Sequence, residues 1–206
     1  YNRVQGKDRV AIELRNMLRM DEFKTRADQE YLKALLAEHF KQFRNERIEC
    51  MFKPRQVAER RGDLLHLTLD GADQEKFGLP RMTGNYNMPL VLDFSVYGGY
   101  IYGASGRDAI KVVFLVMPHV KKSTNLNLTL LDKMIAIAAQ SGPLPPSLYT
   151  LLDGAGDNWS SLMFAHHENY CRAGVFKDVV VGRCVVSATH GAHDGIFADI
   201  GEKFGD

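Results

Sequence analysis

The sequence has 206 residues, of which 45% are hydrophobic, 25% charged and 10% aromatic, as is typical of a folded globular protein. This composition excludes a fibrous, a low-complexity and an intrinsically disordered chain. With 26 Lys and Arg against 25 Asp and Glu the net charge is +1, so overall charge favours neither a nucleic acid nor a membrane as a partner.

Charge and cysteine distribution give further limits. Residues 1–62 contain 15 Lys and Arg against 10 Asp and Glu, and the remaining residues contain 11 against 15. The three cysteines include no CxxC pair, so we predict neither a disulfide framework nor a cysteine zinc site. These features indicate a reducing, intracellular compartment, which would be the nucleus in a eukaryote.

The chain ends and the apolar segments indicate no targeting or membrane segment. No apolar run approaches the ~20 residues of a membrane span, and the first residues lack the apolar core of a signal peptide. We therefore expect no membrane partner. Because the sequence starts without Met and ends just after a helical pattern, we expect it to be part of a longer protein.

The first 62 residues form a predicted basic helical arm. Residues 7–61 have almost no Gly or Pro and carry apolar residues at helical spacing, which predicts two helices. The second should begin near Thr25, whose hydroxyl can cap it, with Asp28 three residues later. A solvated helix face is one interpretation of the basic side chains, and contact with a DNA backbone is the other. The candidates for DNA contact are Lys33, Lys41, Arg44, Arg47 and Arg55.

Residues 63–206 show the pattern of predicted strands and helices that is typical of an α/β domain. Apolar, β-branched and aromatic runs predict three strands that form an antiparallel meander, with a turn or bulge at Gly98-Gly99 in the second. Helices and strands then alternate, which predicts a mixed sheet with helices on its faces. The predicted strands are 64–69, 88–102, 110–117, 147–152 and 179–186, and the predicted helices are 125–140, 158–173 and 193–204.

Three aspartates lie where such a sheet concentrates polar chemistry. Asp70 closes the first strand, Asp153 closes the fourth, and Asp194 lies at the start of the last helix. Converging carboxylates repel one another unless they take up protons or bind cations, and oxygen-only ligands suit Mg²⁺ or Mn²⁺. Asp-Gly turns and an aspartate helix cap remain the structural alternative for each acid taken alone.

Other candidates carry weaker signals. His190 and His193 near Asp194 leave a transition-metal site as an alternative. Trp159 and Tyr170 could stack on bases, but their helix also carries several apolar residues that suit a core.

A family resemblance covers residues 64 to 200. The stretch HLTLDGADQEKFGLP at residues 66–80 closely resembles the DGxDQxKxxLP signature of an uncharacterised transposase-derived family whose domain is RNase H-like, of the DDE/D integrase type. Three shorter stretches follow in the same order, namely STNLNLT (123–129), LPPSLY (144–149) and GVFKDV (174–179). The resemblance implies an RNase H-like domain over residues 63–206, which the basic helical arm of residues 1–62 precedes.

The resemblance also implies an activity, which is transposase or nuclease chemistry on DNA. Asp70, Asp153 and Asp194 would hold two Mg²⁺ or Mn²⁺ ions for phosphodiester transfer or cleavage. Asp73 and Asp157 would support or replace these ligands, and His190 would orient the nucleophile or shield phosphate charge. DNA is the expected partner, and self-association is left open.

The last motif differs from the family pattern, which leaves two alternative functions open. The family has a GHTHEDID motif, whereas this chain has SATHGAHDGIF at residues 187–197 and lacks the first His and the middle Glu-Asp. One alternative is therefore a domesticated, catalytically silent module that binds nucleic acid or protein. A hydrolase for a different phosphoester is the other, and it predicts no affinity for DNA.

Overall fold

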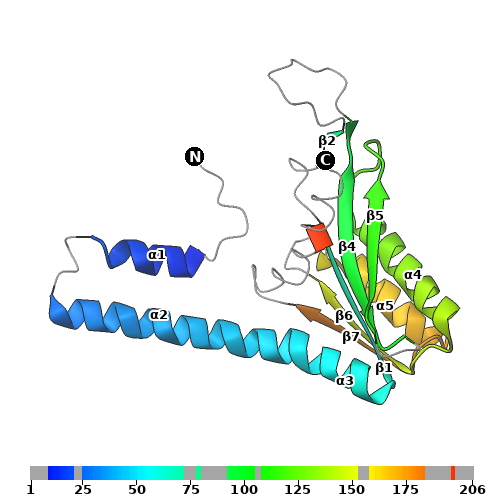
Figure 1. Cartoon of the computed structure of the whole chain (residues 1–206), viewed down its shortest axis with the longest axis horizontal. Coiled ribbons are helices and arrows are strands. Elements are labelled where there is room, and N and C mark those ends of the chain that lie inside the picture. Colours follow the sequence, from blue (N-terminus) through cyan, green and yellow to red (C-terminus); the bar gives the residue numbers. More distant parts are fainter. Residues whose placement is uncertain are drawn as a thin grey trace.

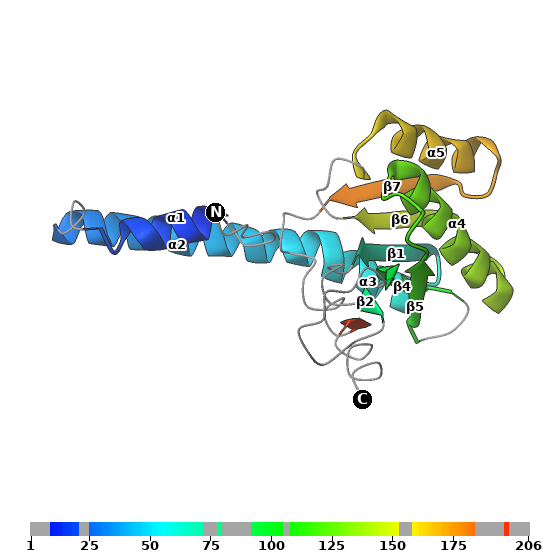
Figure 2. The same ribbon diagram turned by 90° about the horizontal axis from the view of Figure 1, so that it is seen from above.

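The structure is a computed structural model that describes residues 9–20, 25–71, 78–79, 92–104, 108–152, 158–183 and 196–197. Within these ranges a five-stranded sheet carries helices on both faces, and a long helix projects away from it (Figures 1 and 2). No helix of the described ranges is both long and apolar enough to cross a membrane.

The first two helices form a hairpin, and the chain then continues in helical conformation up to the sheet. The predicted cap is confirmed, because the Thr25 hydroxyl accepts a hydrogen bond from the Asp28 amide at 3.1 Å. One π-helical segment interrupts the second predicted helix, so that the arm contains more elements than expected. The elements are α1 (Arg9–Met17), α2 (Arg26–Arg47), the π-helix η2 (Ile48–Phe52) and α3 (Lys53–Arg61).

The hairpin of α1 and α2 has a small buried core. Ala11 and Leu32 are its buried apolar residues, and the Arg15 guanidinium lies 5.5 Å from the centre of the Phe40 ring. The Gln29 side chain donates a hydrogen bond to the Leu18 carbonyl at 3.2 Å. Beyond this hairpin core, Lys33, Lys41 and Arg44 of α2 are exposed to solvent.

The sheet has the strand arrangement expected for an RNase H-like domain. Its order is β5-β4-β1-β6-β7, with β1, β4 and β5 antiparallel and with β6 and β7 parallel to β1. Two short strands form a separate antiparallel pair, of which the first was not predicted and the second is part of the strand predicted over 88–102. The strands are β1 (Leu64–Gly71), β2 (Gly78–Leu79), β3 (Leu92–Asp93), β4 (Ser95–Tyr102), β5 (Ile110–Val116), β6 (Ser147–Leu152) and β7 (Asp178–Arg183).

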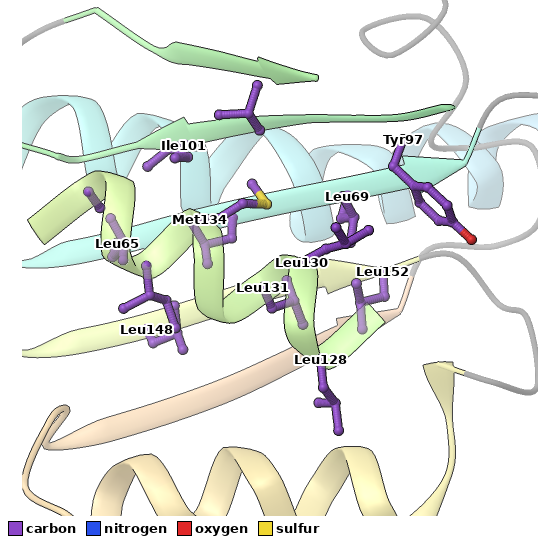
Figure 3. Packing of buried hydrophobic residues seen from close by; sticks show 14 of the residues in the cluster. Leu65, Leu69, Tyr97, Ile101, Leu128, Leu130, Leu131, Met134, Leu148 and Leu152 are labelled. Atoms are coloured by element: carbon purple, nitrogen blue, oxygen red, sulfur yellow. The ribbon is translucent and has the colours of Figure 1, made fainter. Parts of the chain in front are cut away.

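Two helices cover one face of the sheet. They are α4 (Thr124–Ser141) and α5 (Ser161–Arg172), capped by the hydroxyls of Ser123 and Ser160. Leu131 and Met134 of α4 are almost fully buried over the central strand, and Figure 3 shows them beside Leu65 and Leu69. Tyr170 of α5 packs against the same cluster, as the core interpretation predicts.

The C-terminal part of the helical arm covers the opposite face. Met51 of η2 and Phe43 of α2 pack with Leu151 of β6, and Ala58 of α3 is buried beside the sheet. The helical arm is therefore anchored on the sheet through its C-terminal part, from Phe43 to Ala58. The boundary at residue 62 between an arm and a domain stays a prediction.

Two predicted features differ from the structure. Gly98 and Gly99 lie inside the continuous strand β4, paired in regular register with Asp70 and Leu69, so the predicted turn or bulge is wrong. A Cβ atom on Gly99 would lie 2.4 Å from the Thr68 carbonyl oxygen, so close packing of the strands explains this glycine. The helix predicted from residue 158 begins instead at Ser161, because Ser160 is its cap. Of the helix predicted over 193–204, the structure describes residues 196–197.

Candidate functional site

The carboxyl ends of β1 and β6 lie side by side and form the candidate site. Leu69 of β1 is in register with Leu152 of β6, which is in register with Arg183 of β7. Asp70 follows Leu69 and is half-buried. We call this end of the three parallel strands the carboxyl edge.

The face on which Asp70 lies is defined by its neighbour across the sheet. Asp70 pairs with Gly98 of β4, and directly paired residues point to the same side of a sheet. A Cβ atom on Gly98 would lie 3.0 Å from Phe197 Cε1 and 3.2 Å from Ile196 Cγ2. The 196–197 segment therefore packs on the sheet beside Asp70, on the face that carries its side chain.

The N-termini of α4 and α5 meet near the same edge. The Ser160 hydroxyl accepts a hydrogen bond from the Met163 amide at 3.3 Å and lies 3.2 Å from the Thr124 hydroxyl. The Asn127 amide donates to the Asn158 side-chain oxygen at 2.7 Å in a buried contact. These bonds join the two helix starts, whose dipoles favour negative charge nearby.

Arg183 adds a positive charge to the carboxyl edge. It is the last residue of β7, and its guanidinium lies 5.5 Å from the centre of the Trp159 ring. The cation and the two helix starts together make this edge suited to an anionic ligand. The sequence analysis named Trp159 but missed Arg183, because only the register of β7 brings the two residues together.

Most of the predicted catalytic and metal-binding residues lie outside the described residues. Asp70 is described, whereas the other candidates lie in ranges that the structure does not describe. Among the described residues no group of three His, Cys, Asp or Glu side chains is arranged to hold a metal ion. The predicted residues outside the described ranges are Asp73, Asp153, Asp157, His190, His193 and Asp194.

The basic residues of α2 form a stripe that most of its acidic residues avoid. Counting about 100° per residue, Lys33 and Arg44 fall within about 20° of each other, with Lys41 and Arg47 about 60° from Arg44 on either side. Glu38 and Glu46, and also Asp28, lie more than about 100° from the centre of this basic stripe, whereas Glu30 lies within it, about 40° from Arg44, and pairs with Arg26 at 3.0 Å. A helical projection of the sequence would have found this separation.

The basic residues differ in their contacts. Lys33 and Arg44 are exposed, and the Lys41 ammonium lies 3.7 Å from a Glu38 carboxylate oxygen. Arg47 is half-buried. These four residues share α2, so the structure brings them onto one helix.

Arg55 lies apart from the other predicted DNA contacts. It belongs to α3, where its Nε donates to Glu59 at 2.7 Å and its guanidinium lies 4.9 Å from the centre of the Tyr102 ring. The hydrogen bond that Arg55 donates to Glu59 is the main reason that the pKa of Arg55 is raised. Tyr102 pairs with His66 near the start of β1, far along the strand from Asp70.

The polar residues of α5 make internal contacts. The Tyr170 hydroxyl donates to Asp132 of α4 at 2.5 Å, and His166 Nε2 lies 3.0 Å from the same carboxylate oxygen. Burial raises the pKa of the Tyr170 hydroxyl. Burial also lowers the pKa of His167, whose ring nitrogens lie 2.8 Å from the Met163 carbonyl and 3.2 Å from the Thr150 hydroxyl. These residues tie α5 to α4 and β6.

Comparison with solved structures finds complexes of the mariner transposase Mos1. The chain is 12% identical to the protein of the Mos1 strand transfer complex, with a TM-score of 0.42 over 94% of this chain and 64% of that one. For the Mos1 paired end complex with Mn the identity is 12% and the TM-score 0.42, over 99% of this chain and 67% of that one. For the paired end complex with Mg the identity is 11% and the TM-score 0.40, over 99% of this chain and 68% of that one. The chain thus spans about two thirds of the Mos1 chains, and the fold assignment rests on the strand order described above.

Comparison with protein families gives a match over more than half of the chain. No curated protein matches the sequence. Residues 90–206 match the family described as a domain of unknown function, DUF7869. This match begins after the 66–80 motif and includes β4 to β7. The protein therefore belongs to the DUF7869 family.

Proposed function

We propose that this protein is a transposase-derived polynucleotidyl transferase or nuclease of the DDE/D type, which acts on phosphodiester bonds of DNA with Mg²⁺ or Mn²⁺. One observation carries the proposal. At the carboxyl edge, Asp70 lies beside the end of β6 and beside the 196–197 segment. The other two predicted acids are one or two residues from these neighbours in the sequence.

The position of Asp153 in the sequence supports its pairing with Asp70. Asp153 directly follows Leu152, the residue in register with Leu69, and consecutive Cα atoms are about 3.8 Å apart. Leu151 packs on the face covered by Met51, whereas Leu152 belongs to the core under α4 and α5. Continued alternation would direct residue 153 to the face that carries Asp70.

The position of Asp194 is supported by the packing at Gly98. Two residues separate Asp194 from Phe197, and one separates it from Ile196, so that chain connectivity limits its Cα to about 8 Å from that of Ile196. Ile196 is 2% exposed and packs against Gly98, the partner of Asp70. We therefore expect Asp194 to lie near the same edge.

The chemistry of the donor set fits a hard divalent cation. Asp70, Asp153 and Asp194 provide only oxygen atoms, which Mg²⁺ and Mn²⁺ prefer, and Asp73 and Asp157 could add more. The chemistry that two such cations supply when bound is activation of a water or a 3′-hydroxyl and stabilisation of the leaving oxygen. Arg183 and the helix starts would attract the phosphate, and His190 would orient the nucleophile or shield phosphate charge.

The basic stripe of α2 supports DNA as the substrate. Phe43 packs with Leu151 near the end of β6, and Arg44 is the next residue along the helix. In Figure 2 the helix extends on the side toward which β6 and β7 point. A DNA backbone bound along Lys33, Lys41, Arg44 and Arg47 could therefore continue to the carboxyl edge.

The same stripe also favours the second function, a catalytically silent module that binds nucleic acid. The charge separation on α2 involves none of the proposed metal ligands. DNA affinity without metal binding would therefore identify the silent module.

A metal titration tests the catalytic proposal. A cation that binds only the folded state should raise the melting temperature, with a stabilisation of about 2.7 kcal/mol at a hundred times its dissociation constant. We expect Mn²⁺ and Mg²⁺ to raise the melting temperature of the wild-type chain, and Asp70→Asn to abolish the rise. We also expect cleavage of end-labelled DNA in Mn²⁺ by the wild type and none by Asp70→Asn.

Asp178→Asn is the matched control. Asp178 is an exposed aspartate at the opposite end of the parallel strands, where β7 begins. Its replacement should leave both the metal-dependent shift and DNA cleavage unchanged. An absent shift together with uncleaved DNA would refute the enzyme and leave the silent module.

A further inference from the structure

Strand β5 is the outer strand of the sheet and carries an unusual number of exposed apolar side chains. It pairs with β4 on one side, and no strand of the described ranges pairs with its other side. Val113, Leu115 and Met117, at alternate positions along and just after the strand, are 43%, 60% and 51% exposed. Edge strands of this kind are usually protected by charge, proline or a cover, because they recruit other strands.

A groove runs beside this edge, between β5 and α4. Its volume is about 1050 Å³, and its apolar wall includes Phe114, Leu126, Leu130 and Ile137. Lys121 and Lys133 also line it, and no acidic residue does. An apolar groove with cationic groups at its wall favours an apolar ligand that carries carboxylates.

We propose that the edge of β5 binds an extended segment of another protein that is apolar over about five residues and has carboxylates at its ends. The segment would add a strand to the sheet. Its backbone would form hydrogen bonds with β5, which gives affinity that does not depend on the partner's sequence.

The side chains of such a segment would have two apolar surfaces to cover. In a strand, alternate side chains point to opposite faces of the sheet. One set would enter the groove over Leu126 and Ile137, and the other would pack with Val113 and Leu115 on the opposite face. Carboxylates at the ends of the segment would reach Lys121 and Lys133.

A second copy of this protein fits the edge less well. The only charged residue of β5 is Lys111, so that two β5 strands paired with each other would supply no carboxylate to the groove lysines and would add positive charge to the interface. Like charges brought together at an interface disfavour the pairing. The charge of the groove therefore selects an acidic partner over self-association.

Fluorescence anisotropy with labelled peptides tests this interface on the full chain. The probe is the peptide Glu-Val-Ile-Val-Ile-Val-Glu, and its matched control has lysine at both ends. We expect the glutamate peptide to bind at least tenfold more tightly than the lysine peptide. Methylating every backbone amide of the glutamate peptide should weaken binding at least tenfold, because it removes the bonds to β5 and keeps the side chains.

A charge reversal in the protein makes the test specific. The double variant Lys121→Glu/Lys133→Glu should prefer the lysine peptide, whereas Lys177→Glu, an exposed lysine before β7, should keep the wild-type preference. Equal binding of both peptides, no binding up to millimolar concentration, or a preference that the double variant keeps would overturn the proposal. A concentration-dependent dimer that Leu115→Lys dissociates would make the occupant a second copy and would also overturn it.

Discussion

The two faces of the five-stranded sheet differ in what they bury. The face under α4 and α5 carries Leu65, Leu67 and Leu69 of β1 in one apolar core. The opposite face carries His66, Thr68 and Asp70 of the same strand. Alternate residues of one strand thus serve two purposes, since one set stabilises the fold and the other leads to the candidate site.

The polar face is buried at one end and opens at the other. His66 is 1% exposed and lies between the rings of Tyr102 and Tyr149, with ring centres 5.3 and 5.1 Å away. The Thr68 hydroxyl accepts a hydrogen bond from the Tyr100 amide at 3.3 Å. Asp70, at the end of the row, is half-buried. The polar row therefore becomes accessible only at the carboxyl edge, where charged chemistry costs least.

The largest effect should come from a cavity in the apolar face. Leu131 is 1% exposed in the core between α4 and the sheet. Leu131→Ala should lower the free energy of unfolding by about 3 kcal/mol, because it removes buried methyl groups and leaves a cavity. Urea denaturation followed by circular dichroism would measure the loss. Leu162→Ala, at a leucine 48% exposed on α5, should change stability by less than about 1 kcal/mol.

A similar loss in both variants would contradict the difference in burial between the core under α4 and the outer surface of α5. It would mean that the exposed side of α5 is covered by something that the described residues do not include. The double variant should show additive losses, because Leu131 and Leu162 belong to different surfaces.

Adjacent glycines compare the two faces directly. A Cβ atom on Gly99 would meet the Thr68 backbone oxygen at 2.4 Å and Met134 Cε at 3.0 Å, whereas the nearest atoms to one on Gly98 would be side-chain atoms of Phe197 and Ile196. Gly99→Ala should therefore cost about 2–3 kcal/mol and Gly98→Ala about 1 kcal/mol. Denaturant melts of both variants measure the difference. Equal losses of stability would mean that the 196–197 segment cannot move to accommodate the methyl group added at residue 98.

Much of the fold could be predicted from the sequence, because most strands and helices have a clear pattern or cap. The run from Leu64 to Leu69 and the Thr25 cap are examples. The strand β2 could not be predicted, since a strand of two residues has no periodicity, and β3 was predicted only as part of one strand over 88–102. The π-helix η2 also leaves no signal in an apolar pattern. Gly98 and Gly99 were misread, because their role is close packing between strands and helices that are distant in the sequence.

The candidate site could be predicted only in part. Asp70 was found because it ends a strand, and the structure describes it at the carboxyl edge. The sequence analysis did not assign its face, although Leu65, Leu67 and Leu69 alternate with His66, Thr68 and Asp70 along β1. Gly98 and Arg183 depend on register, which the sequence does not reveal. The assignments of Asp153, Asp194, His190, Asp73 and Asp157 stay predictions.

A pH titration sharpens the comparison on the apolar side. Burial keeps His167 neutral and lowers its pKa below the ordinary value of about 6.5. The unfolded chain therefore binds a proton there that the folded chain does not, so stability is complete above pH ~6.5 and falls as the pH drops below it. Urea melts at pH 7.5 and 5.5 should show a larger acid loss for the wild type than for His167→Gln. The exposed His119→Gln should behave like the wild type.

The smallest effect should come from the polar face at Arg55. This side chain stacks on Tyr102 and bonds Glu59, and it is 45% exposed, so solvent screens both interactions. Arg55→Gln should lower the free energy of unfolding by about 0.5–1 kcal/mol, measured by urea denaturation, and the loss should shrink in 1 M salt. Glu59→Gln should reproduce part of this loss of stability, and the double variant should lose less than the sum of the single losses.

DNA affinity provides a second measurement on Arg55→Gln. Because Arg55 lies apart from the basic stripe of α2, its replacement should leave DNA affinity nearly unchanged, whereas Lys33→Gln with Arg44→Gln should weaken binding and reduce the salt slope by about 0.9 for each lost phosphate contact. An equal loss of affinity in Arg55→Gln would extend the DNA surface onto α3.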